Sequence, residues 1–143
     1  MILVDANILL YASIASFRQH EAAKQWLDRR LNDTAPVGLP WTAVLAYLRL
    51  ATNARMFAPP VPMATAWQRA SAWLAAEPVW TPQPTERHAE VLGTLLAQPG
   101  VQGNLVPDAH LAALAIEHGL TLCSTDGDFA RFPELRWLNP LAP

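Results

Sequence analysis

The feature that most restricts the possible folds is an apolar run at the start of the chain that ends in an acid. Ile2, Leu3 and Val4 are followed directly by Asp5. An apolar run without polar alternation is typical of a strand that is buried on both faces, as in a parallel sheet. In open parallel sheets, the groups that carry chemistry lie at the carboxyl ends of the strands. Asp5 is therefore predicted to form one wall of a functional site.

Short apolar runs alternate with segments of helical periodicity along the rest of the chain. The segment 55–62 is expected to be irregular, because its prolines lack backbone donors and restrict φ. Strands are expected at 37–39, 79–81, 120–124 and 136–138, helices at 20–31, 41–52, 63–76, 85–97 and 107–118, and turns at 8–12 and 129–132. This alternation predicts a three-layer α/β/α sandwich with a mostly parallel central sheet, formed by residues 1–143 as a single domain.

The composition is typical of a folded domain and excludes several classes of protein. Hydrophobic residues make up 52% of the 143 residues and charged residues only 15%, which argues against disorder and for apolar surface covered by a partner or second copy. A net charge of −2 neither marks nor excludes a nucleic-acid binder, since local patches matter more. The single cysteine, Cys123, rules out an intramolecular disulfide. Because no leader or membrane-length apolar run is visible, a cytoplasmic protein is expected.

A second acidic segment repeats the arrangement at Asp5. Asp126 and Asp128 follow the predicted strand at 120–124. Asp-Gly is also a common turn pair, so turn formation is an equally good explanation for Asp126 taken alone. Asp128 precedes Phe129 and could be the N-cap of a short helical turn.

Asp108 lies just inside the helix expected to begin at Pro107. Its neighbours three, four and seven positions later are Leu111, Ala112 and Ala115, so the carboxyl group lies on the apolar face of that helix. An ionised carboxylate directed toward a core is costly unless it is paired or bound to a cation. The position therefore favours a functional role over simple complementarity to the helix dipole.

Acids that gather at strand ends and a helix start repel one another unless a divalent cation offsets their charge. Oxygen ligands of this kind suit Mg²⁺ or Mn²⁺, which commonly activate water in phosphodiester cleavage. The histidines do not offer an alternative metal site, because His20, His88, His110 and His118 share no metal-ligand spacing. Arg49, Arg55 and Arg18 are candidates for phosphate contacts, although Arg49 could equally form a structural salt bridge with one of the acids.

Several ordered segments together resemble the PIN-domain ribonucleases, and in particular the VapC toxins of VapBC toxin–antitoxin modules. The segments that carry the resemblance are Ile2–Asn7, Leu48-Arg49 with Ala51–Asn53, Pro107–Ala115, Glu117–Gly119, Ser124–Phe129, and in the tail Phe132-Pro133, Leu135–Trp137 and Asn139–Leu141. No single segment is specific, but they occur in the family's order over the whole chain.

The resemblance implies an endoribonuclease that uses Mg²⁺ or Mn²⁺ to cut structured RNA, such as transfer or ribosomal RNA. It also implies a homodimer that a VapB-type antitoxin inhibits. By this resemblance Asp5, Asp108 and Asp126 are catalytic, and the same residues with Asp128 bind the metal. Asn7, Arg49 and Thr125 are expected to support them.

One position departs from the family pattern. Many members carry a Glu where this chain has Ala46, just before Tyr47-Leu48-Arg49. Loss of one acidic ligand weakens metal affinity, although Asp128 or a water could partly replace it. The chain could work with a reduced acid set, be a weak or inactive nuclease, or carry an engineered substitution that lowers toxicity.

Two other functions compete with the nuclease. Ala46 favours a degenerate PIN domain that binds RNA or a protein partner without efficient cleavage. A phosphate-handling enzyme on a Rossmann-like sheet ranks lower, because Asn7 stands where a second acid would be needed.

Overall fold

The strand that begins the chain lies at the centre of the sheet. In the computed structural model, which describes residues 1–143, β1 (Ile2–Val4) pairs with β2 (Val37–Gly38) on one side and with β4 (Thr121–Cys123) on the other. β3 (Val79–Trp80) and β5 (Trp137–Leu138) form the edges, giving the order β3-β2-β1-β4-β5. All four pairings are parallel, which confirms the predicted α/β class and parallel sheet.

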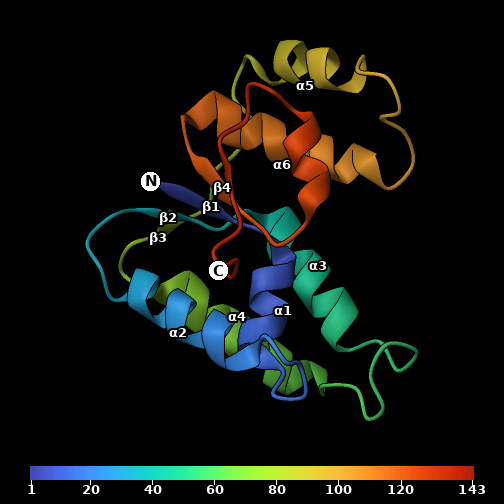
Figure 1. Ribbon diagram of the computed structural model, residues 1–143. Coiled ribbons are helices and arrows are strands. Elements are labelled where there is room, and N and C mark those ends of the chain that lie inside the picture. Colours follow the sequence, from blue (N-terminus) through green and yellow to red (C-terminus); the bar gives the residue numbers. More distant parts are fainter.

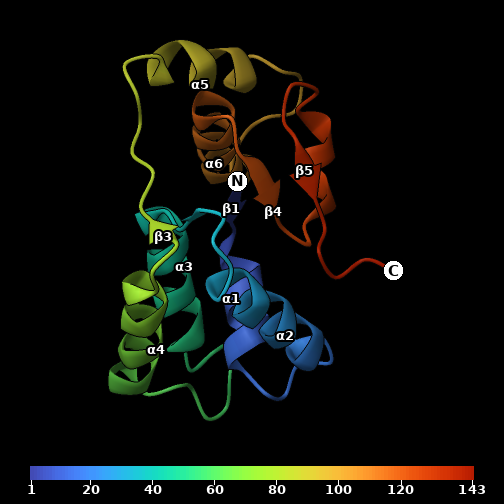
Figure 2. The ribbon, with the colours of Figure 1, turned by 90° about the vertical axis from the view of Figure 1, so that its left-hand side faces the viewer.

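The two faces of the sheet bury different layers of helices. Ile2 and Val4 pack into a core of 17 buried residues, whereas Leu3, which points to the opposite face, belongs to a second core of 12. The larger core is covered by α1 (Ala6–Ser13), α2 (His20–Leu31), α3 (Trp41–Ala51) and α4 (Met63–Ala75), and the smaller by α5 (His88–Leu96), α6 (Leu105–His118) and the 3₁₀ helix η1 (Gly127–Arg131). Figures 1 and 2 show these two layers on either side of the strands.

Three α-helices begin at other residues than predicted, and the turn predicted at 129–132 is the 3₁₀ helix η1, which begins at Gly127. The expected turn at 8–12 is a helix that begins at Ala6, because Asp5 caps it. α6 begins at Leu105 rather than at Pro107. Proline is tolerated as the third residue of the helix, because the N–H groups of the first turn have no helical hydrogen-bond partner that its ring would remove. α5 begins at His88 rather than at Thr85, since the backbone and hydroxyl of Thr85 are held by Glu117.

Gly38 lies where the segment after β3 and the side chain of Leu3 on β1 both approach β2 closely. A Cβ atom on Gly38 would lie 2.9 Å from Cγ of Pro82 and 3.0 Å from Cδ1 of Leu3. The chain after β3 therefore packs directly over β2, which places Pro82 and its neighbours beside the start of α3. No helix of the chain has the length and apolar character needed to cross a membrane.

Candidate metal centre

Asp5 lies at the carboxyl end of β1, and each of its two carboxylate oxygens accepts a hydrogen bond. Its Oδ1 accepts a hydrogen bond from the backbone N–H of Ala6 at 2.7 Å, which caps α1. Its Oδ2 accepts a hydrogen bond from the hydroxyl of Ser124 at 2.8 Å. The side chain is therefore held in one orientation before any ligand binds.

Ser124 joins three of the predicted site residues and was missed by sequence reasoning. Its fully buried hydroxyl donates to Asp5 and accepts from Nδ2 of Asn7 at 3.0 Å and from the backbone N–H of Asp126 at 3.1 Å. Asn7 thus supports Asp5 through Ser124 rather than directly. A usable signal was present, since Ser124 is the polar residue that ends an apolar strand, as Asp5 is in β1.

The acids after β4 are arranged by a short 3₁₀ helix. Oδ1 of Asp126 accepts a hydrogen bond from the backbone N–H of Asp128 at 2.9 Å and so caps η1. The suggestion that Asp128 is the N-cap of this turn is wrong; Asp126 fills that position, and the Asp128 side chain is left free to turn toward α6. Thr125 contributes its backbone N–H, which lies 3.4 Å from Oδ1 of Asn7.

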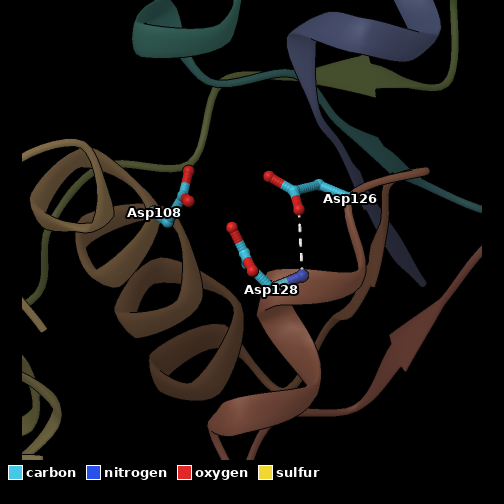
Figure 3. A group of neighbouring side chains, drawn as sticks. All are labelled: Asp108, Asp126 and Asp128. Atoms are coloured by element: carbon cyan, nitrogen blue, oxygen red, sulfur yellow. Dashed lines mark hydrogen bonds between the residues drawn. The ribbon is translucent and has the colours of Figure 1, made fainter. Parts of the chain in front are cut away.

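Three carboxylates converge from two helices, α6 and η1, that β4 separates in the sequence. Asp108 comes from the first turn of α6, and Asp126 and Asp128 come from the start of η1 (Figure 3). Each can place one oxygen within 4.8 Å of the others. Asp5 is not within this group of three, but it lines the same cavity as Asp108.

The cluster carries more negative charge than its surroundings offset. Burial first, and then the negative charges of Asp126, Asp5 and Asp128, raise the pKa of the Asp108 carboxyl to about 6, against the opposing effect of Arg131. Burial also raises the pKa of Asp5, against the hydrogen bonds from Ser124 and Ala6. Arg131 is the only basic side chain paired with these acids, with Nη2 at 3.7 Å from Oδ1 of Asp128. A set of hard oxygen donors with uncompensated charge is consistent with a metal-binding site.

A cavity of about 330 Å³ opens in front of Asp5 and Asp108. Ala46 and Arg49, one helical turn apart on α3, also line it. Position 46 therefore lies at the same cavity as the acids, and here it presents a methyl group. Arg49 is exposed and forms no ion pair, so the alternative of a structural salt bridge to one of the acids does not hold.

A parallel sheet with an aspartate cluster at its carboxyl edge is the arrangement of a PIN domain, and the PIN domain pattern matches residues 2–135. Ribonuclease VapC37 of Mycobacterium tuberculosis is 44% identical over 142 residues, which cover 99% of both chains. Ribonuclease VapC43 of the same species is 41% identical over 141 residues, covering 99% of this chain and 96% of that protein. The chain therefore belongs to the VapC ribonucleases of the PIN domain family.

Solved structures share the same fold at lower identity. VapBC2 from Rickettsia felis, bound to a DNA fragment from its promoter, superposes with a TM-score of 0.70 at 19% identity, covering 97% of this chain and 98% of that one. FitAcB from Neisseria gonorrhoeae gives a TM-score of 0.68 at 22% identity, covering 98% of each chain. At these identities the likeness concerns the fold alone.

Proposed function

We propose that this chain is the toxin of a VapBC module and a metal-dependent endoribonuclease that cuts structured RNA, such as transfer or ribosomal RNA, with Mg²⁺ or Mn²⁺. The observation that carries the proposal is the convergence of Asp108, Asp126 and Asp128 within 4.8 Å of one another. The names of the relatives VapC37 and VapC43 support the ribonuclease activity.

The acids have two different parts in the proposed site. Asp108, Asp126 and Asp128 would hold the metal ion, which supplies an activated water and offsets charge on the phosphate. Asp5, oriented by Ser124, faces the same cavity and would complete the acidic wall. Both carboxylate oxygens of Asp5 accept hydrogen bonds within the chain. These bonds hold the side chain in a fixed position, as is useful for a metal ligand.

Arg49 is positioned to bind the substrate. Its side chain lines the cavity without an acidic partner, so the guanidinium is available for a phosphate oxygen. A negative site needs such a group, because an RNA backbone is otherwise repelled by the four acids.

The proposal is tested by incubating purified protein with total RNA and Mn²⁺ and resolving the products on a gel. Asp5→Asn and Asp126→Asn should abolish cleavage. Asp28→Asn is a matched control, because Asp28 is exposed on α2 and pairs only with Lys24. The proposed mechanism is wrong if Asp5→Asn cuts as well as the parent.

A second function is favoured by one observation, the methyl group of Ala46 at the cavity wall. With one acid fewer than many relatives, the domain would bind RNA or a protein partner without efficient cleavage. Calorimetry with Mn²⁺ separates the two, since a cleaving site should bind the metal and a degenerate one should not.

We also propose a homodimer and a VapB-type antitoxin that places a basic side chain at the acids. The described structures of VapBC2 and FitAcB support such a pairing. Met56, within the proline-rich segment 55–62, and Met63, directly after it, are 53% and 55% exposed and offer apolar surface for a partner. A protein that stays soluble and monomeric at high concentration without a co-expressed partner would count against this proposal.

A further inference from the structure

A second cavity, of about 230 Å³, lies beside the acidic one at the start of α3. Trp41 and Thr42 of α3, Gln83 of the segment after β3, and His110 and Leu114 of α6 line it. Thr42 also lines the acidic cavity, so the two hollows share a wall. Nothing in the proposed metal chemistry uses this second space.

The spacing of residues on α6 makes the two cavities parts of one groove. Pro107 and Leu111 line the acidic cavity, and His110 and Leu114 line the second one. Residues separated by three or four positions share one face of a helix. A single stripe of α6 therefore forms the floor of both cavities, and a chain bound at the acids can continue into the second.

The walls of the second cavity combine a flat aromatic surface with free polar groups. Trp41, the first residue of α3, is 43% exposed. The hydroxyl of Thr42 and the side-chain amide of Gln83 make no hydrogen bond within the chain, since the only hydrogen bond of Gln83 is accepted by its backbone carbonyl. Stacking on an aromatic ring and hydrogen bonds to base edges are how proteins bind unpaired bases.

A buried polar network orients His110 at the edge of this cavity. The carboxylate of Glu117, with no exposed side-chain surface, accepts hydrogen bonds from the N–H and hydroxyl of Thr85 at 2.9 and 2.7 Å. Its other oxygen lies 2.5 Å from Nδ1 of His88, whose Nε2 lies 3.1 Å from Nδ1 of His110. The network fixes the ring of His110 and leaves its Nε2 without a partner in the chain.

We propose that the second cavity binds one unpaired nucleobase of an RNA substrate, stacked against Trp41 and contacted at its edge by His110, Thr42 or Gln83. This inference rests on the proposed ribonuclease function, which it deepens by assigning a single-stranded nucleotide next to the cleaved bond. His110 is a specificity residue here, and Glu117 and His88 are positioning residues that act through it.

The test measures RNA binding apart from cleavage. A fluorescently labelled, short single-stranded RNA of mixed sequence is titrated with the full chain in EDTA, and fluorescence anisotropy gives the Kd. Trp41→Ala should weaken binding by about tenfold, the usual effect of losing one stacked base. Trp41→Phe should retain most of the affinity. The dependence of Kd on salt should be unchanged in Trp41→Ala, because no phosphate contact is lost.

Trp67→Ala is the matched control, since Trp67 lies on α4 and is 46% exposed, close to the value for Trp41. It should bind RNA as the parent does. The proposal is overturned if Trp41→Ala binds RNA like the parent, or if Trp67→Ala loses as much. A change in oligomeric state of Trp41→Ala, seen by light scattering with unchanged RNA affinity, would assign this surface to a protein contact instead and also overturn it.

Binding measured in EDTA tests the base site independently of the proposed nuclease activity. Asp126→Asn should lose cleavage and keep RNA affinity in EDTA, whereas Trp41→Ala should lose affinity in EDTA. If the parent never cuts RNA but Trp41→Ala still weakens binding, the base site stands and the nuclease proposal falls.

Discussion

The hydroxyl of Ser124 donates a hydrogen bond to Oδ2 of Asp5 across 119 positions of sequence, at a distance of 2.8 Å. Because the two residues directly follow neighbouring parallel strands, the bond ties the carboxyl ends of β1 and β4 together. The same hydroxyl accepts from Asn7 and from the N–H of Asp126, so one oxygen sets the geometry of both acidic segments.

Ser124→Ala is expected to destabilise the fold by about 1 to 3 kcal/mol, because it leaves buried polar partners unpaired. It should also lower cleavage activity, since Asp5 and Asp126 lose their common support. Urea denaturation and the RNA gel assay measure the two effects. Ser13→Ala is the matched control: the Ser13 hydroxyl is buried without any hydrogen-bond partner, so its removal should cost little or nothing. Equal losses in the two variants would show that Ser124 is not the organising group.

The pKa of Asp108 predicts how stability without metal depends on pH. Its carboxyl has a pKa of about 6 in the folded chain against an ordinary value of 3.8, so folding favours the protonated form. The contribution of this group to stability is complete below pH 3.8 and is lost as the pH rises through about 6. In EDTA, Asp108→Asn should therefore gain stability relative to the parent across that window. Added Mn²⁺ should stabilise the parent at neutral pH and not the variant. A pH-independent difference between the two proteins would contradict this.

Ala46→Glu should restore an acid to the cavity wall that faces Asp5 and Asp108. Calorimetry with Mn²⁺ is expected to give an affinity about tenfold higher than that of the parent, because an added carboxylate increases ligand charge. In EDTA the same variant should be less stable, since the acids repel one another. Ala46→Gln separates charge from size and should show neither effect. An unchanged Mn²⁺ affinity in Ala46→Glu would place the metal away from this wall.

Glu117→Gln tests the network between α5 and α6. Burial alone would raise the pKa of Glu117, but the hydrogen bonds from Thr85 and the interaction with His88 outweigh it and lower the pKa below 4.5. Its stabilising effect is therefore present above pH 4.5 and lost as the pH falls through the folded value. The variant should be less stable than the parent by about 2 kcal/mol at neutral pH, with a smaller difference in acid. Glu90→Gln, on the exposed side of α5, should show no such dependence in urea denaturation.

Short-range sequence patterns predict most of the fold. The unbroken apolar run Ile2–Val4 and the placement of Asp108 on an apolar helical face were sufficient to predict a parallel sheet with acids at one edge. These features depend on neighbours within a few positions, so periodicity reveals them. The positive φ of Gly119, 66°, likewise follows from its place directly after the last turn of α6.

Contacts between distant elements could not be predicted in the same way. His88 and Glu117 are 29 positions apart, and their contact depends on how α5 packs on α6. Each side chain alone resembles an ordinary surface residue of a helix. The position of Ser124 beside Asp5 required the register of β1 against β4, in which Val4 lies opposite Cys123. Periodicity identifies strands but does not determine which of them are neighbours.

The pairing of β1 with β4 also has a consequence for synthesis of the protein. β1 is translated long before β4, and Ser124, which orients Asp5, directly follows β4. Domains with such non-local pairing cannot complete their sheet until the late segment has emerged from the ribosome. A nuclease built in this way would have no assembled active site until β4 has left the ribosome and paired with β1. The topology would thus keep a nascent VapC chain without nuclease activity until its late strand has paired.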